Sequence, residues 1–119
     1  MPVDSSVLEG ESDIDARNPA YYEEFFAPVA LIFRVKGEQE AIQLANDSPY
    51  GLGGSVITRN LERGKRVARK IDTGMVFINK ACWTAPELPF GGVKNSGYGR
   101  ELSGLGMGEF VNKKLIRVA

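Results

Sequence analysis

The chain has 119 residues, of which 43% are hydrophobic, so it has the length of one ordinary domain and enough apolar side chains for a core. Lysine plus arginine and aspartate plus glutamate number 15 each, and the zero net charge speaks against a nucleic-acid partner or a membrane surface. The sequence has no histidine, so we expect no metal site and no self-contained hydrolase triad. The single cysteine, Cys82, excludes an internal disulfide and predicts a reducing, cytoplasmic compartment.

The first third of the chain predicts a poorly ordered start, a strand and a helix. Residues 1–20 are polar and acidic, with a turn signal at Asn18-Pro19, and we expect them to be extended or poorly ordered. Residues 29–35 are apolar apart from Arg34, which is typical of a strand buried on both faces. Residues 38–46 carry alanine and isoleucine at helical spacing and predict a helix.

The middle of the chain predicts a second strand, a second helix and a third strand. The second strand lies within residues 51–58, Asn60 is a plausible N-cap for a helix over 61–71, and residues 75–79 form the third strand. Alternation of strands and helices with short connections indicates an α/β fold with a partial parallel sheet of three strands and crossover helices. Such a small sheet has open edges that need partners, so the pattern indicates part of a larger protein.

The last third contains a block dense in glycine, PFGGVKNSGYGREL at residues 89–102. Glycine loses the most backbone freedom on folding, so this density predicts an ordered loop of special geometry. Short helical turns are expected over 101–110 and a terminal strand over 113–118, which has no neighbouring strand in the chain. A small phosphate or nucleotide binder built on residues 91–100 is a weaker reading, because the block lacks the usual phosphate-loop endings.

Four segments carry motifs that occur together in one enzyme family. They are Glu-x-Phe-x-Pro-Val at 24–29, Ala-Asn-x-x-x-Tyr-Gly-Leu at 45–52, Gly-x-Val-x-x-Asn at 74–79 and PFGGxKxSGxGRE at 89–101. In this order they resemble the C-terminal part of the NAD(P)-dependent aldehyde dehydrogenase superfamily. Residues 82–84 and 98–103 look most like bacterial succinate-semialdehyde dehydrogenases. Ala27 departs from the family, which usually has glycine there.

The resemblance implies a division of the chain and an activity for the whole enzyme. Residues 21–100 would be the C-terminal part of the catalytic domain, and 101–119 would hold short helical turns and a terminal strand that joins an intersubunit sheet in a homo-oligomer. The parent enzyme would oxidise an aldehyde, with succinate semialdehyde as one candidate, to a carboxylate with NAD or NADP.

The resemblance also implies roles for five residues. Glu24 would hydrogen-bond the hydroxyls of the nicotinamide ribose, and Phe26 would pack beside the nicotinamide. Phe90 would line the mouth of the substrate tunnel, and Trp83 and Thr84, in the loop before it, would set substrate preference. From the residues alone, Glu24 could equally be a solvated surface acid, and Phe26 or Trp83 a packing aromatic.

Two further residues have competing interpretations. Asn79, at the predicted end of a strand, either ties down the following loop, which we favour, or contacts the substrate. Cys82 matches no catalytic position of the family, whose nucleophilic cysteine would lie outside this chain, so it is interpreted as a loop residue.

Because the sequence offers neither that nucleophile nor a dinucleotide fold, we assign no catalytic residue and expect the isolated chain to be inactive and to bind no cofactor. The alternative is a non-enzymatic oligomerisation or interaction module that uses its exposed sheet edges.

Overall fold

The structure is a computed structural model that describes residues 14–119, so the expectation for residues 1–13 lies outside the described part. Residues 14–20, which we expected to be extended or poorly ordered, contain a turn that leads into a 3-10 helix, η2 (Pro19–Tyr22). The Asn18 side chain accepts a hydrogen bond from the Ala20 amide and Pro19 occupies the first helical position, so the Asn-Pro pair starts a helix instead of a loop.

Two helices form where the apolar spacing predicts them. Helix α1 spans Glu38–Asn46, and α2 spans Leu61–Ala68. The predicted N-cap is confirmed, since the Asn60 side chain accepts a hydrogen bond of 2.9 Å from the Arg63 amide. Helix α2 ends three residues before the predicted position 71, because the chain tightens into hydrogen-bonded turns after Ala68.

Only two of the three predicted strands pair in parallel. Strand β2 (Gly53–Val56) pairs with β3 (Met75–Ile78), with Gly53 opposite Met75. A second, antiparallel pair joins β1 (Tyr50–Gly51) to β4 (Val93–Lys94) in the glycine-rich block, and this pair was not predicted. The predicted strand over residues 29–35 is wrong for this structure, because that segment has no regular structure and finds no strand to pair with among residues 14–119.

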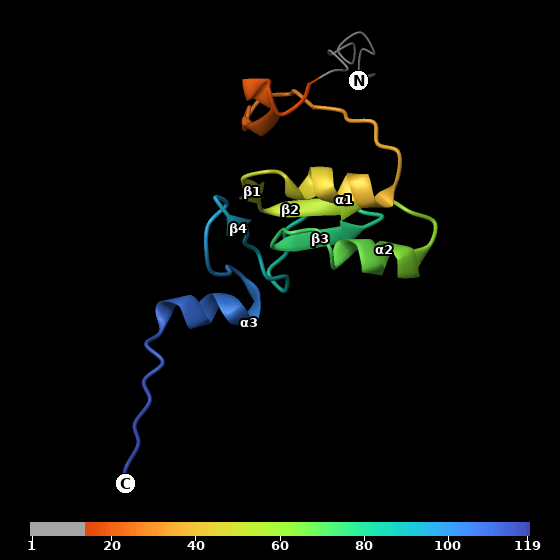
Figure 1. Ribbon diagram of the computed structural model, residues 1–119. Coiled ribbons are helices and arrows are strands. Elements are labelled where there is room, and N and C mark those ends of the chain that lie inside the picture. Colours follow the sequence, from red (N-terminus) through yellow and green to blue (C-terminus); the bar gives the residue numbers. More distant parts are fainter. Residues whose placement is uncertain (1–13) are drawn as a thin grey trace.

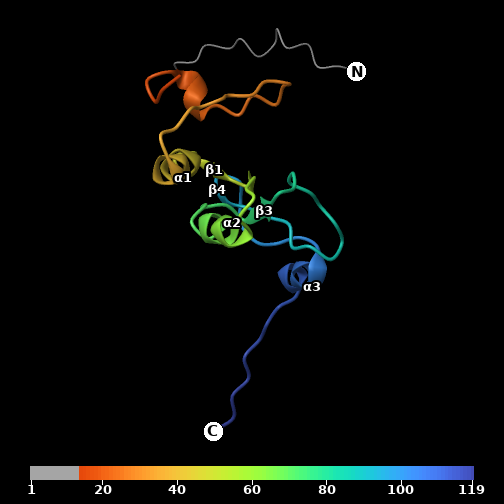
Figure 2. The ribbon, with the colours of Figure 1, turned by 90° about the vertical axis from the view of Figure 1, so that its right-hand side faces the viewer.

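The β2–β3 pair has helices on one side and a loop on the other. A Cβ placed on Gly64 of α2 would lie 3.0 Å from the side chains of Ile78 and Thr58, so this glycine lets the helix approach the strands closely. On the opposite face, Cys82 of the loop after β3 lies over Gly53. Figure 2 shows α1 and α2 on one side of the strands and the loop on the other. Among the described hydrophobic residues, only Ile42 of α1 is buried, at 7% exposure.

The last twenty residues hold two short helical elements and an extended tail. Helix α3 (Ser103–Gly106) continues into a 3-10 helix, η3 (Met107–Phe110), as the sequence predicts. The predicted strand over 113–118 does not form, because no strand edge lies beside it, and Figure 1 shows this segment running away from both sheets. No helix in the part of the chain that is described has the length and apolar character needed to cross a membrane.

Candidate functional site

The glycine-rich block folds back on itself and presents Phe90 at its base. Phe90 and Glu101 exchange two backbone hydrogen bonds of 2.9 and 2.7 Å. The Arg100 guanidinium donates from Nη1 to the carbonyl oxygens of Gly92 and Gly99, at 2.8 and 2.6 Å. Gly99 has a φ of 80°, a conformation that favours glycine. The block is therefore an ordered loop, and Arg100 closes it internally.

Three of the predicted site residues lie around one hollow of about 410 Å³, which we name the Trp83 hollow. Its lining comes from β1–β2, β3, the loop after β3 and the base of the glycine-rich block: Leu52, Gly53, Met75, Cys82, Trp83, Thr84 and Phe90. The sequence pattern placed Trp83, Thr84 and Phe90 together only through the resemblance; here the chain itself brings them together. Apart from the Thr84 hydroxyl, the Cys82 thiol and the Trp83 indole N–H, the lining side chains are apolar, which suits a small and mostly apolar ligand.

Cys82 also lines the Trp83 hollow, although the sequence analysis treated it only as a loop residue. Its Sγ lies 3.8 Å from the Ser55 hydroxyl of β2. Its position directly before Trp83 could have indicated this place in the hollow. The small residue that makes room for Cys82, Gly53, lies far away in the sequence and gave no such indication.

Glu24 lies at a second hollow of about 420 Å³, which we name the Glu24 hollow. Polar groups line much of it: Ser48, Tyr50, Thr73, Asn95 and Ser96 share the wall with Glu24. Leu52 and Gly53 line both hollows, so the two sites adjoin across this dipeptide. Phe26 lines neither hollow; its side chain is 93% exposed, and its φ of 45° is unusual for a residue with a side chain.

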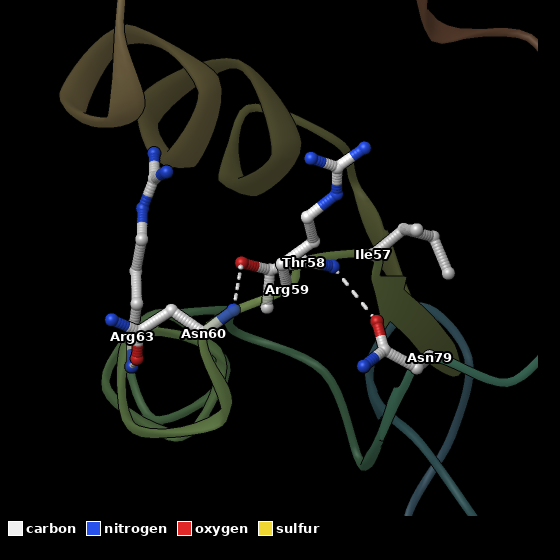
Figure 3. Close-up of a pocket in the computed structure, with 6 residues that line it drawn as sticks. All are labelled: Ile57, Thr58, Arg59, Asn60, Arg63 and Asn79. Atoms are coloured by element: carbon white, nitrogen blue, oxygen red, sulfur yellow. Dashed lines mark hydrogen bonds between the residues drawn. The ribbon is translucent and has the colours of Figure 1, made fainter.

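Asn79 makes a structural hydrogen bond, as we favoured, but to the end of β2 and not to the loop that follows it. Its side-chain Oδ1 accepts a hydrogen bond of 2.8 Å from the Thr58 amide, which joins the ends of β3 and β2. The Asn60 amide in turn donates to the Thr58 hydroxyl at 3.2 Å (Figure 3). The φ of Asn79 is 55°, a left-handed conformation that asparagine tolerates better than most residues.

A third, wide-open hollow of about 760 Å³ lies beside these hydrogen bonds (Figure 3). It is lined by Ile57, Thr58, Arg59, Asn60, Arg63 and Asn79. Arg63 extends toward α1, where its Nε donates to the Glu38 carboxylate at 2.7 Å, so this arginine already has a partner within the chain.

Several family-motif residues act together as a structural junction. The Asn46 side chain donates to the Lys70 carbonyl and accepts from the Asp72 amide, each at 2.8 Å, and so ties the end of α1 to the turn before β3. Lys94 donates from Nζ to the carbonyls of Asn46 and Ser48, at 2.9 and 3.1 Å. Sequence reasoning missed this junction, because its members lie more than twenty residues apart.

The shifted pKa values of Tyr21 and Glu38 report on the packing around α1. Burial, together with the hydrogen bond that its hydroxyl donates to Asp47, raises the pKa of Tyr21 to about 12. The ring also packs edge-on against Phe33. Hydrogen bonding from Arg63, opposed by desolvation and helped by the charge of Arg66, lowers the pKa of Glu38. The hydrogen bond from Tyr21 to Asp47 thus fixes the segment that contains Glu24 against the end of α1.

Known proteins share both the sequence and the fold of this chain. The family model described as "Aldehyde dehydrogenase family" matches residues 11–116. Among curated relatives, the succinate-semialdehyde dehydrogenase [NADP(+)] of Deinococcus radiodurans is 56% identical over 106 residues, which cover 89% of this chain and 22% of that protein. A probable succinate-semialdehyde dehydrogenase [NADP(+)] of Synechocystis is 49% identical, over 91% of this chain and 24% of the relative.

The solved structures agree. The succinic semialdehyde dehydrogenase of Streptococcus pyogenes in complex with NADP+ superposes with a TM-score of 0.83 at 56% identity, over 88% of this chain and 23% of that one. A Mycobacterium tuberculosis aldehyde dehydrogenase complexed with NAD+ gives a TM-score of 0.77 at 43% identity, over 82% and 20%. The chain therefore spans about a quarter of the length of the relatives it matches. On this evidence, the chain belongs to the aldehyde dehydrogenase family.

Proposed function

We propose that these residues form the substrate-entry and nicotinamide-side part of an NADP-dependent succinate-semialdehyde dehydrogenase. The observation that carries the proposal is the Trp83 hollow, where Trp83, Thr84 and Phe90 lie around one space against Leu52, Gly53 and Met75 of the strand region. The identity to relatives named for this substrate and for NADP+ supports the choice of aldehyde and cofactor.

The residues of the Glu24 hollow fit the ribose side of a dinucleotide. A carboxylate accepts hydrogen bonds from hydroxyl groups, and Glu24 shares its hollow with hydroxyl and amide side chains that suit a polyol. Phe26, exposed two residues along, offers a ring face to a flat aromatic partner. When bound, the dinucleotide supplies the hydride acceptor for aldehyde oxidation. Glu24 would hold and orient it.

The residues of the Trp83 hollow would bind and orient the aldehyde. Trp83 and Phe90 supply apolar walls that exclude water from its carbon chain, and the Thr84 hydroxyl offers a hydrogen bond to a polar group of the substrate. No cationic side chain lines this hollow, so a charge that pairs with the succinate carboxylate would come from outside these residues. We assign no catalytic residue here, and the isolated chain is proposed to be inactive.

A chimera tests this function. The matching segment of the Deinococcus radiodurans enzyme is replaced by residues 11–116 of this chain, and NADPH formation from succinate semialdehyde is followed by absorbance. We expect turnover, with Thr84→Ala raising the KM for the aldehyde and Glu24→Gln raising the KM for NADP+, each by roughly tenfold, the loss of one substrate hydrogen bond. A folded chimera without turnover, or one in which both variants change the two KM values alike, would contradict the proposed roles.

A further inference from the structure

Strand β2 begins with two adjacent glycines, and the space that each leaves open belongs to a different face of the strand. A Cβ on Gly54 would meet nothing closer than the Ile71 side chain, at 3.7 Å, which is ordinary contact. A Cβ on Gly53 would instead lie 3.2 Å from the Sγ of Cys82, in the loop after β3. Since successive side chains of a strand point to opposite faces, only Gly53 of the two lines the Trp83 hollow.

The Cys82 thiol occupies the space that Gly53 leaves open. Its Sγ lies 3.8 Å from the hydroxyl of Ser55, which is two residues beyond Gly53 and therefore on the same face of β2. A contact of 3.2 Å is tighter than the separation of about 3.5–4.0 Å at which nonbonded carbon atoms attract best. A methyl group at position 53 would therefore displace the thiol by a few tenths of an ångström.

The same contact holds the loop that carries Trp83 and Thr84. Within residues 14–119, the contact of Cys82 with Ser55 is the one hydrogen bond that residues 80–84 make. Trp83 and Thr84 follow Cys82 directly, and all three side chains line the Trp83 hollow. A displacement of the thiol would therefore be passed along the backbone to the two side chains that follow it.

We propose that Gly53 is a positioning residue of the Trp83 hollow, because it leaves room for the Cys82 thiol and so seats the loop after β3 on β2. The seated loop fixes where Trp83 and Thr84 stand. A side chain at position 53 would move both residues by acting on the thiol. The inference rests on the proposed function for what the hollow binds, and it deepens that function by naming the residue that sets the shape of the hollow.

Kinetics of the chimera test this role. We expect Gly53→Ala to raise the KM for succinate semialdehyde roughly tenfold, the effect of moderate overpacking, and to leave the KM for NADP+ within about twofold of the parent value. Gly54→Ala is the matched control, because its methyl group enters the other face of β2, and both KM values should stay at the parent level. Cys82→Ala removes the crowded atom, so adding Gly53→Ala to it should change the aldehyde KM by less than about twofold.

The seat of the loop is also tested without turnover. Ser55→Cys places a second thiol beside Cys82, and oxidised glutathione should join the two in a disulfide, which mass spectrometry of the digested chimera identifies. We expect Gly53→Ala to slow this cross-link roughly threefold or more, because it moves the Cys82 thiol away from β2. Gly54→Ala should leave the rate unchanged.

The outcomes separate this inference from the proposed function. A chimera without turnover, in which only Gly53→Ala slows the cross-link, supports the positioning role and removes the function. An active chimera in which the two glycine variants have the same aldehyde KM, or the same cross-linking rate, overturns the positioning role and leaves the function standing. If Gly53→Ala is insoluble, Cys82→Ala should restore its solubility, and failure of that rescue also overturns the role.

Discussion

At the scale of single residues, the close approach of Gly74 to the glycine-rich block is the strictest packing constraint in the described chain. A Cβ on Gly74 would lie 1.9 Å from the carbonyl oxygen of Gly91, which is backbone and cannot rotate away. We expect Gly74→Ala to destabilise the chimera by about 3 kcal/mol, measured as a lowered midpoint of thermal unfolding. The matched control is Gly104→Ala, where nothing lies within 4 Å of the added methyl. Equal midpoints for the two variants would contradict this packing.

Asn79 gives a second residue-scale prediction. Asn79→Ala removes the acceptor of the Thr58 amide, and we expect hydrogen exchange at that amide to become about tenfold faster, the loss of roughly one hydrogen bond. Asn79→Asp keeps a side-chain oxygen at the same place and should retain most of the protection. Exchange that is unchanged in Asn79→Ala would show that the hydrogen bond does not hold β2 and β3 together.

At the scale of elements, the Glu38 carboxylate joins α1 to α2 through Arg63 and Arg66, at 2.7 and 3.7 Å. Because the pKa of Glu38 is lowered in the folded chain, its contribution is fully present above its ordinary value of 4.5 and is lost as the pH falls through the lowered pKa. We expect amide protection in α1 to fall in the parent as the pH drops below about 4.5 and through the lowered pKa of Glu38, and to be flatter in Glu38→Gln. Glu62→Gln serves as the control, because Glu62 pairs only within α2.

Lys94 connects the glycine-rich block to the end of α1, and it gives a second prediction at this scale. Lys94→Met removes the hydrogen bonds to Asn46 and Ser48 and the ion pair of 3.3 Å with Asp72. We expect the free energy of unfolding of the chimera, measured in urea, to fall by about 1–2 kcal/mol. The ion pair contributes less than a buried pair would, because Asp72 is well exposed. Lys113→Met, on the unpaired tail, should have no measurable effect, and a similar loss there would contradict the junction.

The elements also show what sequence can predict. Helices α1 and α2 and strands β2 and β3 were predictable from the apolar periodicity and from the N-cap Asn60. Each of these signals lies within a single short segment of the sequence. The strand predicted at 29–35 did not form, because pairing depends on an edge that residues 14–119 do not supply. The β1–β4 pair and the Lys94 contacts join positions over forty residues apart, which no local pattern encodes. The Trp83 hollow likewise sets Leu52 and Gly53 against the loop after β3, and its predicted residues were grouped only through the family resemblance.

At the scale of the whole molecule, the small buried core predicts an unusual heat capacity of unfolding. A compact domain of 119 residues would have a value of about 1.4–1.8 kcal/mol/K, in proportion to the apolar surface that unfolding exposes. Ile42 is the only buried hydrophobic residue in the described part, so little apolar surface remains to be exposed on unfolding. We expect calorimetry of the isolated chain to give a heat capacity of unfolding less than about half that of a compact domain. Within the chimera, the same residues should contribute to the heat capacity of unfolding in proportion to their number. A full value for the isolated chain would mean that its exposed apolar segments find cover in solution, and would contradict this prediction.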